Sequence, residues 1–126
     1  MKVASKEISR ELYKALDSIG VLMDVHFIYC DTGVIQWKDA TIKDVANCFP
    51  AFTMCELWDL LPSTPEFGYP NLMKDYGGKG SQAEYMAVYS APIMKKNPCD
   101  ALAAVLLWSI SEGHFNNYVK DKKQTI

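Results

Sequence analysis

Little in this sequence favours a nucleic-acid or membrane partner. The chain contains a single arginine, Arg10, and its formal net charge is only -2. Arginine makes many of the bidentate contacts to phosphate and guanine in nucleic-acid readers, so its scarcity argues against that class of protein. The longest apolar run, Ala101 to Trp108, is far shorter than the roughly 20 residues that span a bilayer. We therefore predict neither a nucleic-acid nor a membrane partner.

A secretory leader is also missing from the pattern. The N-terminus leads directly into a charged amphipathic segment and has no apolar signal-peptide core. The four cysteines form no Cys-x-x-Cys pair; they are Cys30, Cys48, Cys55 and Cys99. Without a secretory signal, such side chains are expected to be reduced and largely buried thiols. The sequence thus predicts a cytoplasmic protein.

Histidine is almost as scarce as arginine, which limits the metal and acid–base chemistry open to the chain. The two histidines are His26 and His114. On a strand, His26 and Cys30 would lie about 13 Å apart, too far to share a zinc ion. Neither histidine lies in a recognisable nucleophile motif. We predict no catalytic residues, no metal and no cofactor, and we favour a protein that is not an enzyme.

The N-terminal half has the periodicity of a helix followed by a hairpin. Apolar residues recur at helical spacing over residues 5–19, and Gly20 ends that segment. Residues 23–30 alternate as in a strand, and 34–37 would form the returning strand. Asp31-Thr32-Gly33 between them fits a hairpin loop in which glycine supplies a positive φ.

The middle of the chain is less clearly patterned. Residues 40–49 fit either a short helix, which we favour, or a strand. Residues 53–56, Thr-Met-Cys-Glu, match a capping box, and Pro62 closes the short helix that follows. Residues 84–91 have strand character, and no further strand is predicted between them and Asn97.

The last helix, residues 98–110, is the most strongly marked element. Asn97 is its predicted N-cap, Pro98 suits the first helical position, and Gly113 lies just past its end. Almost every face of this helix is apolar, so it must be covered on more than one side. Either another helix or a second subunit would provide this cover, and we predict a homodimer rather than a monomer.

These elements predict one α+β domain over residues 1–115, followed by a polar C-terminal tail, 116–126. The expected architecture is a small antiparallel sheet of three to four strands, with two main helices and one short helix packed on it.

A long loop, residues 63–82, is the predicted contact surface. It combines glycine and proline with apolar and aromatic side chains of the kind enriched at interfaces. Its predicted partner-binding residues are Phe67, Tyr69, Leu72, Met73, Tyr76 and Lys79. Residues 76–81, Tyr-Gly-Gly-Lys-Gly-Ser, lack the glycine spacing of a nucleotide-binding loop, although a looser anion contact at Lys79 stays open. The tryptophans are predicted to pack in a core or an interface rather than to stack on bases.

Two motifs resemble small uncharacterised proteins encoded by bacteriophages and prophages of gut bacteria. Residues 50–62 resemble a P-A-P-T-L-x-E-L-x-x-W/L-L-P stretch, with Phe52 in place of proline. Residues 97–113 resemble N-P-A-D-A-L-A followed by L-x-W-L-I-E-x-G. The resemblance covers about a quarter of the chain. It implies an α+β fold and a phage-linked origin, and it carries no catalytic residues to transfer.

We therefore predict a non-catalytic, phage-type accessory protein that binds a host or phage protein in the host cytoplasm. One alternative is a sequestering protein that closes the 63–82 loop over a small nucleotide-like molecule. A less favoured alternative is a nucleotide-degrading enzyme with His26 or His114 as acid or base.

Overall fold

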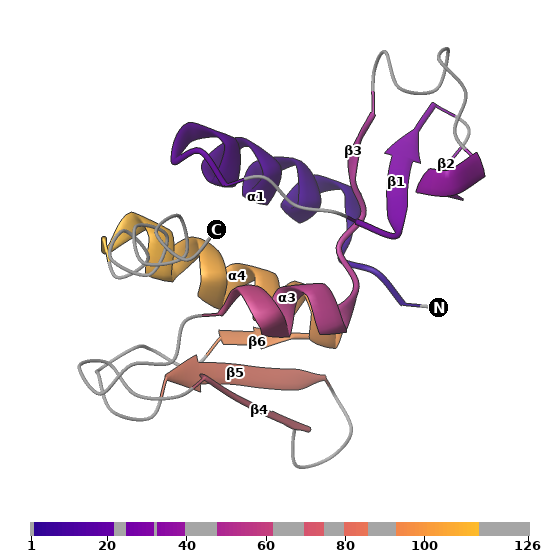
Figure 1. The fold of residues 1–126 in the computed structure, drawn as a ribbon. Helices are drawn as coiled ribbons and strands as arrows, with labels where there is room; N and C mark the ends of the chain where they lie inside the picture. The colour runs from indigo at the N-terminus through magenta and orange to yellow at the C-terminus, as the bar shows by residue number, and fades with distance from the viewer. Residues whose placement is uncertain are drawn as a thin grey trace.

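The chain adopts an α+β fold, as predicted (Figure 1). The computed structural model describes residues 2–21, 25–31, 33–39, 48–61, 70–74, 80–85 and 93–113. Its helices are α1 (Lys6–Ser18), α3 (Met54–Leu60) and α4 (Pro98–Ser111), with a 3-10 turn, η1 (Trp37–Asp39). Its strands are β1 (Phe27–Cys30), β2 (Gly33–Gln36), β3 (Phe49–Pro50), β4 (Pro70–Lys74), β5 (Ser81–Tyr85) and β6 (Ile93–Lys95).

The strands form two antiparallel sheets rather than the single small sheet expected. The first sheet has the order β2-β1-β3, and the second sheet has the order β4-β5-β6. In Figure 1 the first sheet lies beside one end of the helices, and the second sheet lies beneath α4 and α3. In the second sheet each strand pairs with the next strand along the chain, whereas in the first sheet β1 pairs both with β2 and with the later strand β3.

Local sequence signals place all three helices correctly. In α1, Leu12 and Leu16 are buried, as the helical spacing requires. At the start of α3, Thr53 and Glu56 form the predicted reciprocal capping box. At the start of α4, the Asn97 side chain accepts a hydrogen bond from a backbone N–H two residues on.

The predicted hairpin is present in the first sheet. The pairing register runs from Phe27 opposite Gln36 to Cys30 opposite Gly33. Gly33 has the predicted positive φ, +120°, but it lies in β2 rather than in the loop. The strand expected over 23–30 begins at Phe27. Of the ambiguous segment 40–49, residues 40–47 lie outside the described residues.

The second sheet corrects three of our sequence predictions. β4 lies entirely within the range predicted as a loop, 63–82, and β5 begins in it. β5 also starts before the strand expected at 84–91, and β6 is a strand that the sequence did not predict. Leu72, Ala83 and Ile93 are paired across this sheet and pack into the core, so the sheet is stabilised by tertiary burial.

Helix α4 lies at the centre of the molecule. It contacts α1, α3 and the second sheet, and the last of these packs on it through β5 and β6. Leu102, Val105 and Leu106 are among its fully buried side chains. The cover that the sequence required is therefore provided within one chain, so the apolar character of α4 does not itself call for a second subunit. The homodimer stays a prediction.

An N-terminal segment, residues 2–5, contacts elements from the first sheet to the last helix. Val3 forms an isolated bridge with Thr53, and the Ala4 backbone N–H donates to Phe52. The Asn97 side chain donates to the Val3 carbonyl, and the Ser5 backbone N–H donates to the Asp100 carboxylate. The Tyr29 hydroxyl donates to the Ala4 carbonyl. This short segment thus contacts β1, the start of α3 and the start of α4.

None of the helices in the described residues has the length and apolarity needed to cross a membrane. The predicted polar tail, 116–126, lies outside the described residues.

Candidate functional site

A hollow of about 840 Å³ opens between the first sheet and the N-terminal ends of α3 and α4. Its described lining residues are Lys2, 25–27, 36–38, 53–55 and Cys99. They come from the N-terminal segment, the first sheet with η1, α3 and α4, so the tertiary structure alone assembles this site. We refer to it below as the hollow.

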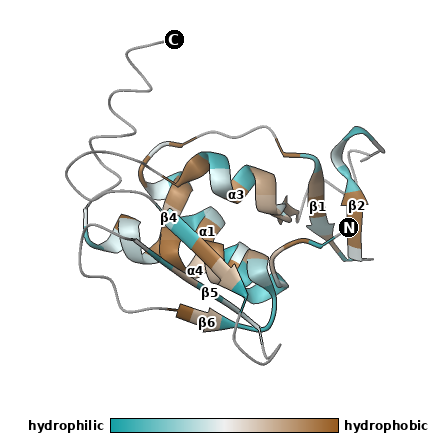
Figure 2. Ribbon diagram, turned by 90° about the horizontal axis from the view of Figure 1, so that it is seen from below, coloured by the Kyte–Doolittle hydropathy of each residue, from teal (hydrophilic) through white to brown (hydrophobic). Residues whose placement is uncertain are grey.

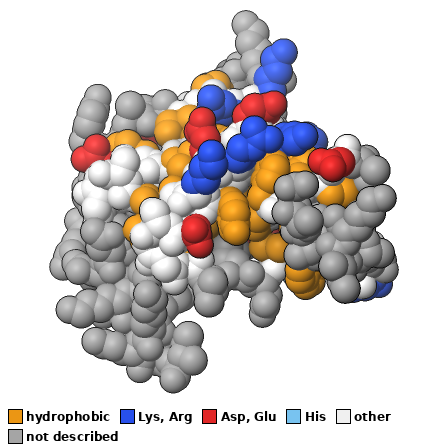
Figure 3. All heavy atoms as spheres, turned by 90° about the horizontal axis from the view of Figure 1, so that it is seen from above, with side chains coloured by type: hydrophobic (Ala, Val, Ile, Leu, Met, Phe, Trp, Pro, Cys, Tyr) orange, Lys and Arg blue, Asp and Glu red, His pale blue; other side chains and the backbone are white. Residues whose placement is uncertain are grey.

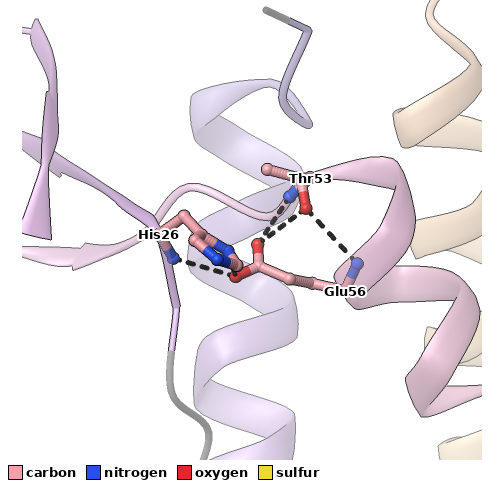
Figure 4. Close-up of polar contacts among 3 residues, drawn as sticks. All are labelled: His26, Thr53 and Glu56. Atoms are coloured by element: carbon pink, nitrogen blue, oxygen red, sulfur yellow. Dashed lines mark hydrogen bonds and ion pairs between the residues drawn. The ribbon is translucent and has the colours of Figure 1, made fainter.

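A buried carboxylate holds one wall of the hollow in place. The Glu56 side chain is only 7% exposed. Its Oε1 accepts hydrogen bonds from the backbone N–H and the hydroxyl of Thr53, at 2.8 and 3.0 Å. Its Oε2 accepts one from the backbone N–H of His26, at 2.9 Å, and lies 3.2 Å from the His26 ring (Figure 4). One carboxylate therefore caps α3 and also fixes the residue that precedes β1.

The His26 side chain lies at the edge of the hollow and is 79% exposed. Its Nδ1 is the ring nitrogen that contacts Glu56, so the other ring nitrogen is outside this contact (Figure 4). A histidine oriented by a carboxylate is a common component of acid–base sites. Cys55 and Cys99 line the same hollow.

Two large apolar side chains are exposed at the hollow. Trp37 is 49% exposed and Met54 is 38% exposed. Trp37 is therefore not a core residue, and its packing in an interface stays a prediction. Tryptophan and methionine are both enriched in protein interfaces.

The exposed charges among the residues that line the hollow are basic, and the Glu56 carboxylate lies buried behind His26 and Thr53. Lys2 and Lys38 are exposed, and the described lining residues include no aspartate or glutamate. The face above α1 is different, because exposed lysine and arginine alternate there with exposed acidic side chains (Figure 3). The hollow is thus locally basic on a chain whose net charge is slightly negative.

The two cysteines at the hollow differ in accessibility. Cys55 is exposed, whereas Cys99 is fully buried. Burial, with a smaller contribution from the Asp100 carboxylate, raises the pKa of the Cys99 thiol. A buried thiol with a raised pKa is a poor nucleophile, so Cys99 contributes packing rather than reactivity.

The partner-binding residues predicted from the sequence are not brought to the hollow where the structure describes them. Leu72 is half-buried in β4 and packs against the core. Met73 is 43% exposed on the opposite face of the same strand. Phe67, Tyr69, Tyr76 and Lys79 lie outside the described residues, as does His114.

A second exposed apolar group lies on the outer face of the second sheet. Met73 and Met94 both pair with Gln82, so the three side chains form a row across the sheet. Both methionines are exposed. Figure 2 views this sheet from the side away from α4, with its strands in front of the helices.

Among the described residues, no group of three or more histidine, cysteine, aspartate or glutamate side chains is arranged to hold a metal ion. Comparisons of the chain with models of protein families, with curated proteins and with solved structures found no match. The function is therefore inferred from the geometry of the hollow.

Sequence patterns could not have identified the hollow. His26 and Glu56 are 30 positions apart, and no spacing rule connects them. The capping box did mark Glu56 as a structured carboxylate, but it gave no indication that the same side chain would also bind His26.

Proposed function

We propose that this protein acts without catalysis, by binding another protein at the hollow. The supporting observation is the exposure of Trp37 and Met54 on the edge of a concave, largely apolar site. Large apolar side chains that become buried on binding, in a pocket surrounded by polar residues, supply most of the binding energy at protein interfaces.

A host or phage protein is the proposed partner. This part of the proposal rests on the two motifs that resemble phage and prophage proteins, at residues 50–62 and 97–113. Both motifs lie at starts of helices that line the hollow, α3 and α4. The cytoplasm of the host cell is the proposed location for the same reason.

Affinity capture with matched variants tests this function. The immobilised protein is presented with a bacterial lysate, beside a Trp37→Ala/Met54→Ala double variant and a Trp58→Ala control. Trp58 is 45% exposed and does not line the hollow, so the control removes a comparable aromatic surface. We expect one protein to be retained by the wild type and by the control, with at least about a tenfold loss in the double variant. Equal retention by all three would contradict the proposal.

A small-molecule sequestering role is the second candidate. The volume of the hollow lies within the range of about 300–1,000 Å³ that is typical of ligand pockets. Lys2 and Lys38 would suit the phosphate of a nucleotide-like ligand, and Trp37 would suit its base. Thermal stabilisation by a ribonucleotide, lost in a Lys2→Ala/Lys38→Ala variant, would favour this candidate over the protein partner.

The third and least favoured candidate is a nucleotide-degrading enzyme. The observation that favours it is the contact between His26 and Glu56. The His26→Ala variant tests it. Loss of a nucleotide hydrolysis activity with unchanged folding would replace our proposal with this one.

A further inference from the structure

Strand β2 is an edge strand of the first sheet as described, and its outward peptide groups can be assigned from the pairing. The Trp37 backbone N–H donates to the His26 carbonyl, so that pair is hydrogen-bonded. Hydrogen-bonded and non-hydrogen-bonded pairs alternate along an antiparallel ladder. The backbone N–H and C=O groups of Val34 and Gln36 therefore point away from β1.

The same two residues connect this edge to the hollow. Gln36 lies opposite Phe27, and both line the hollow. Because side chains alternate along a strand, Val34 lies on the same face as Gln36. Val34 is 43% exposed. A strand added beside β2 would likewise direct every second side chain to the face that carries the hollow.

We propose that the partner engages this protein through an extended acidic segment that pairs with the edge of β2 and places an apolar side chain in the hollow. This inference rests on the proposed function and names the chemistry of its partner. Backbone pairing supplies affinity in such strand addition, and pockets for alternate side chains supply specificity.

Charge complementarity selects an acidic segment over a basic one. Lys38 directly follows the Trp37 anchor in η1, and Lys2 lines the hollow from the N-terminal segment. The charges that a ligand can contact there are those of the two exposed lysines, because the Glu56 carboxylate is buried and bonded to Thr53 and His26. An acidic segment therefore meets attraction at the hollow, whereas a basic segment meets repulsion. A second copy of β2 would be a poor occupant, because it would bring a second Lys38 to the same edge.

A display library of random peptides tests the inference. Peptides of about eight residues cover β2 and η1 at about 3.3 Å per residue. We expect selection on the wild-type protein to enrich aspartate or glutamate together with aromatic or large aliphatic residues at alternate positions. The affinity of the most enriched peptide is then measured by fluorescence anisotropy, unmodified and with alternate backbone nitrogens methylated.

Backbone pairing is tested from both sides of the complex. Methylation of the peptide nitrogens that face β2 should weaken binding by about tenfold or more. Val34→Pro should have a similar effect, because it removes an outward N–H that the ladder with β1 does not use. Val34→Thr keeps that N–H and serves as the control. If Val34→Pro does not fold, backbone pairing is still tested by the loss of affinity of the methylated peptide for the wild-type protein.

The outcomes separate this inference from the proposed function. Binding that is lost in Trp37→Ala but unaffected by methylation and by Val34→Pro would overturn strand addition and leave the hollow as the protein-binding site. If the selection enriches no peptide that is both acidic and apolar, the inference is also overturned. The proposed function is tested separately, by the capture experiment with the Trp37→Ala/Met54→Ala variant. Enrichment of peptides whose binding survives Lys38→Glu would contradict the charge argument.

Discussion

The Glu56 carboxylate accepts three hydrogen bonds from Thr53 and from the His26 backbone, lies 3.2 Å from the His26 ring, and is almost fully buried. Glu56→Ala leaves backbone N–H groups of both residues without this acceptor, so we expect a loss of about 2–4 kcal/mol in the free energy of unfolding. Glu56→Gln keeps one acceptor oxygen and should lose less. Urea unfolding followed by circular dichroism measures both, and a change below about 0.5 kcal/mol for Glu56→Ala would contradict this role.

The Cys99 thiol makes the free energy of unfolding depend on pH in the alkaline range. Its pKa is raised in the folded chain, first by burial and then by Asp100. Above about pH 8.5 the unfolded chain therefore loses this proton while the folded chain retains it, and the free energy of unfolding falls as pH rises. We expect the free energy of unfolding to fall less between about pH 8 and 9.5 in Cys99→Ala than in the wild type. The window stops at about pH 9.5 because the pKa of Tyr29 is also raised, from an ordinary value of about 10. Equal pH dependence in the two proteins would contradict it.

The first turn of α4 holds the N-terminal segment at Ser5, in addition to the contacts of that segment with Phe52, Thr53 and Tyr29. The Asp100 Oδ1 atom accepts the Ser5 backbone N–H at 2.6 Å. Asp100→Ala should therefore increase hydrogen exchange at the Ser5 amide by about tenfold or more, whereas Asp100→Asn retains an acceptor and should change it less. Exchange measured by NMR tests this, and an unchanged Ser5 amide in Asp100→Ala would show that the anchor lies elsewhere.

The second sheet requires glycine at the residue immediately before β5. A Cβ atom on Gly80 would lie much closer to the carbonyl oxygen of Lys95, at the end of β6, than van der Waals contact allows. The φ of Gly80 is also +156°, a backbone conformation that residues with a side chain rarely adopt. We expect Gly80→Ala to cost roughly 2 kcal/mol or more in thermal or urea unfolding. Gly33→Ala is the control, since Gly33 also has a positive φ but has open space around its Cβ position. An equal or larger cost in the control would contradict the steric explanation.

The helices and the second sheet share one core, because α4 contacts α1, α3 and the second sheet. Leu102 is fully buried in α4, and Leu102→Ala should cost about 2–5 kcal/mol. Since the core is shared, we expect amides in both α1 and β5 to lose hydrogen-exchange protection together. Loss confined to β5 would indicate that the second sheet unfolds as a separate unit.

The oligomeric state is also a property of the whole molecule. The predicted homodimer rested on the apolar surface of α4, which α1, α3 and the second sheet now cover. Light scattering at high protein concentration tests the dimer directly. A dimer would have to use another surface, and the row of Met73, Gln82 and Met94 on the outer face of the second sheet is the candidate to disrupt first.

The sequence by itself determined the features that depend on near neighbours in the chain. Thr53 and Glu56 form a capping box across the first turn of α3, and the Asn97 side chain caps α4 by accepting the Cys99 backbone N–H. The apolar spacing of α1 and the hairpin ending at Gly33 were likewise readable. Each of these involves groups within a few residues of one another, whose geometry is fixed by helix or turn periodicity whatever the rest of the chain does.

Only the tertiary structure decided the second sheet and the hollow. Residues 70–74 carry proline and polar side chains, so their local pattern predicted a loop, yet pairing with β5 and burial of Leu72 make them a strand. The contact of His26 with Glu56 and the exposure of Trp37 are also set by which distant segments meet. Hydrogen bonding across a sheet and packing against a helix are non-local interactions, and their free energy can exceed the weak local preference of a short segment.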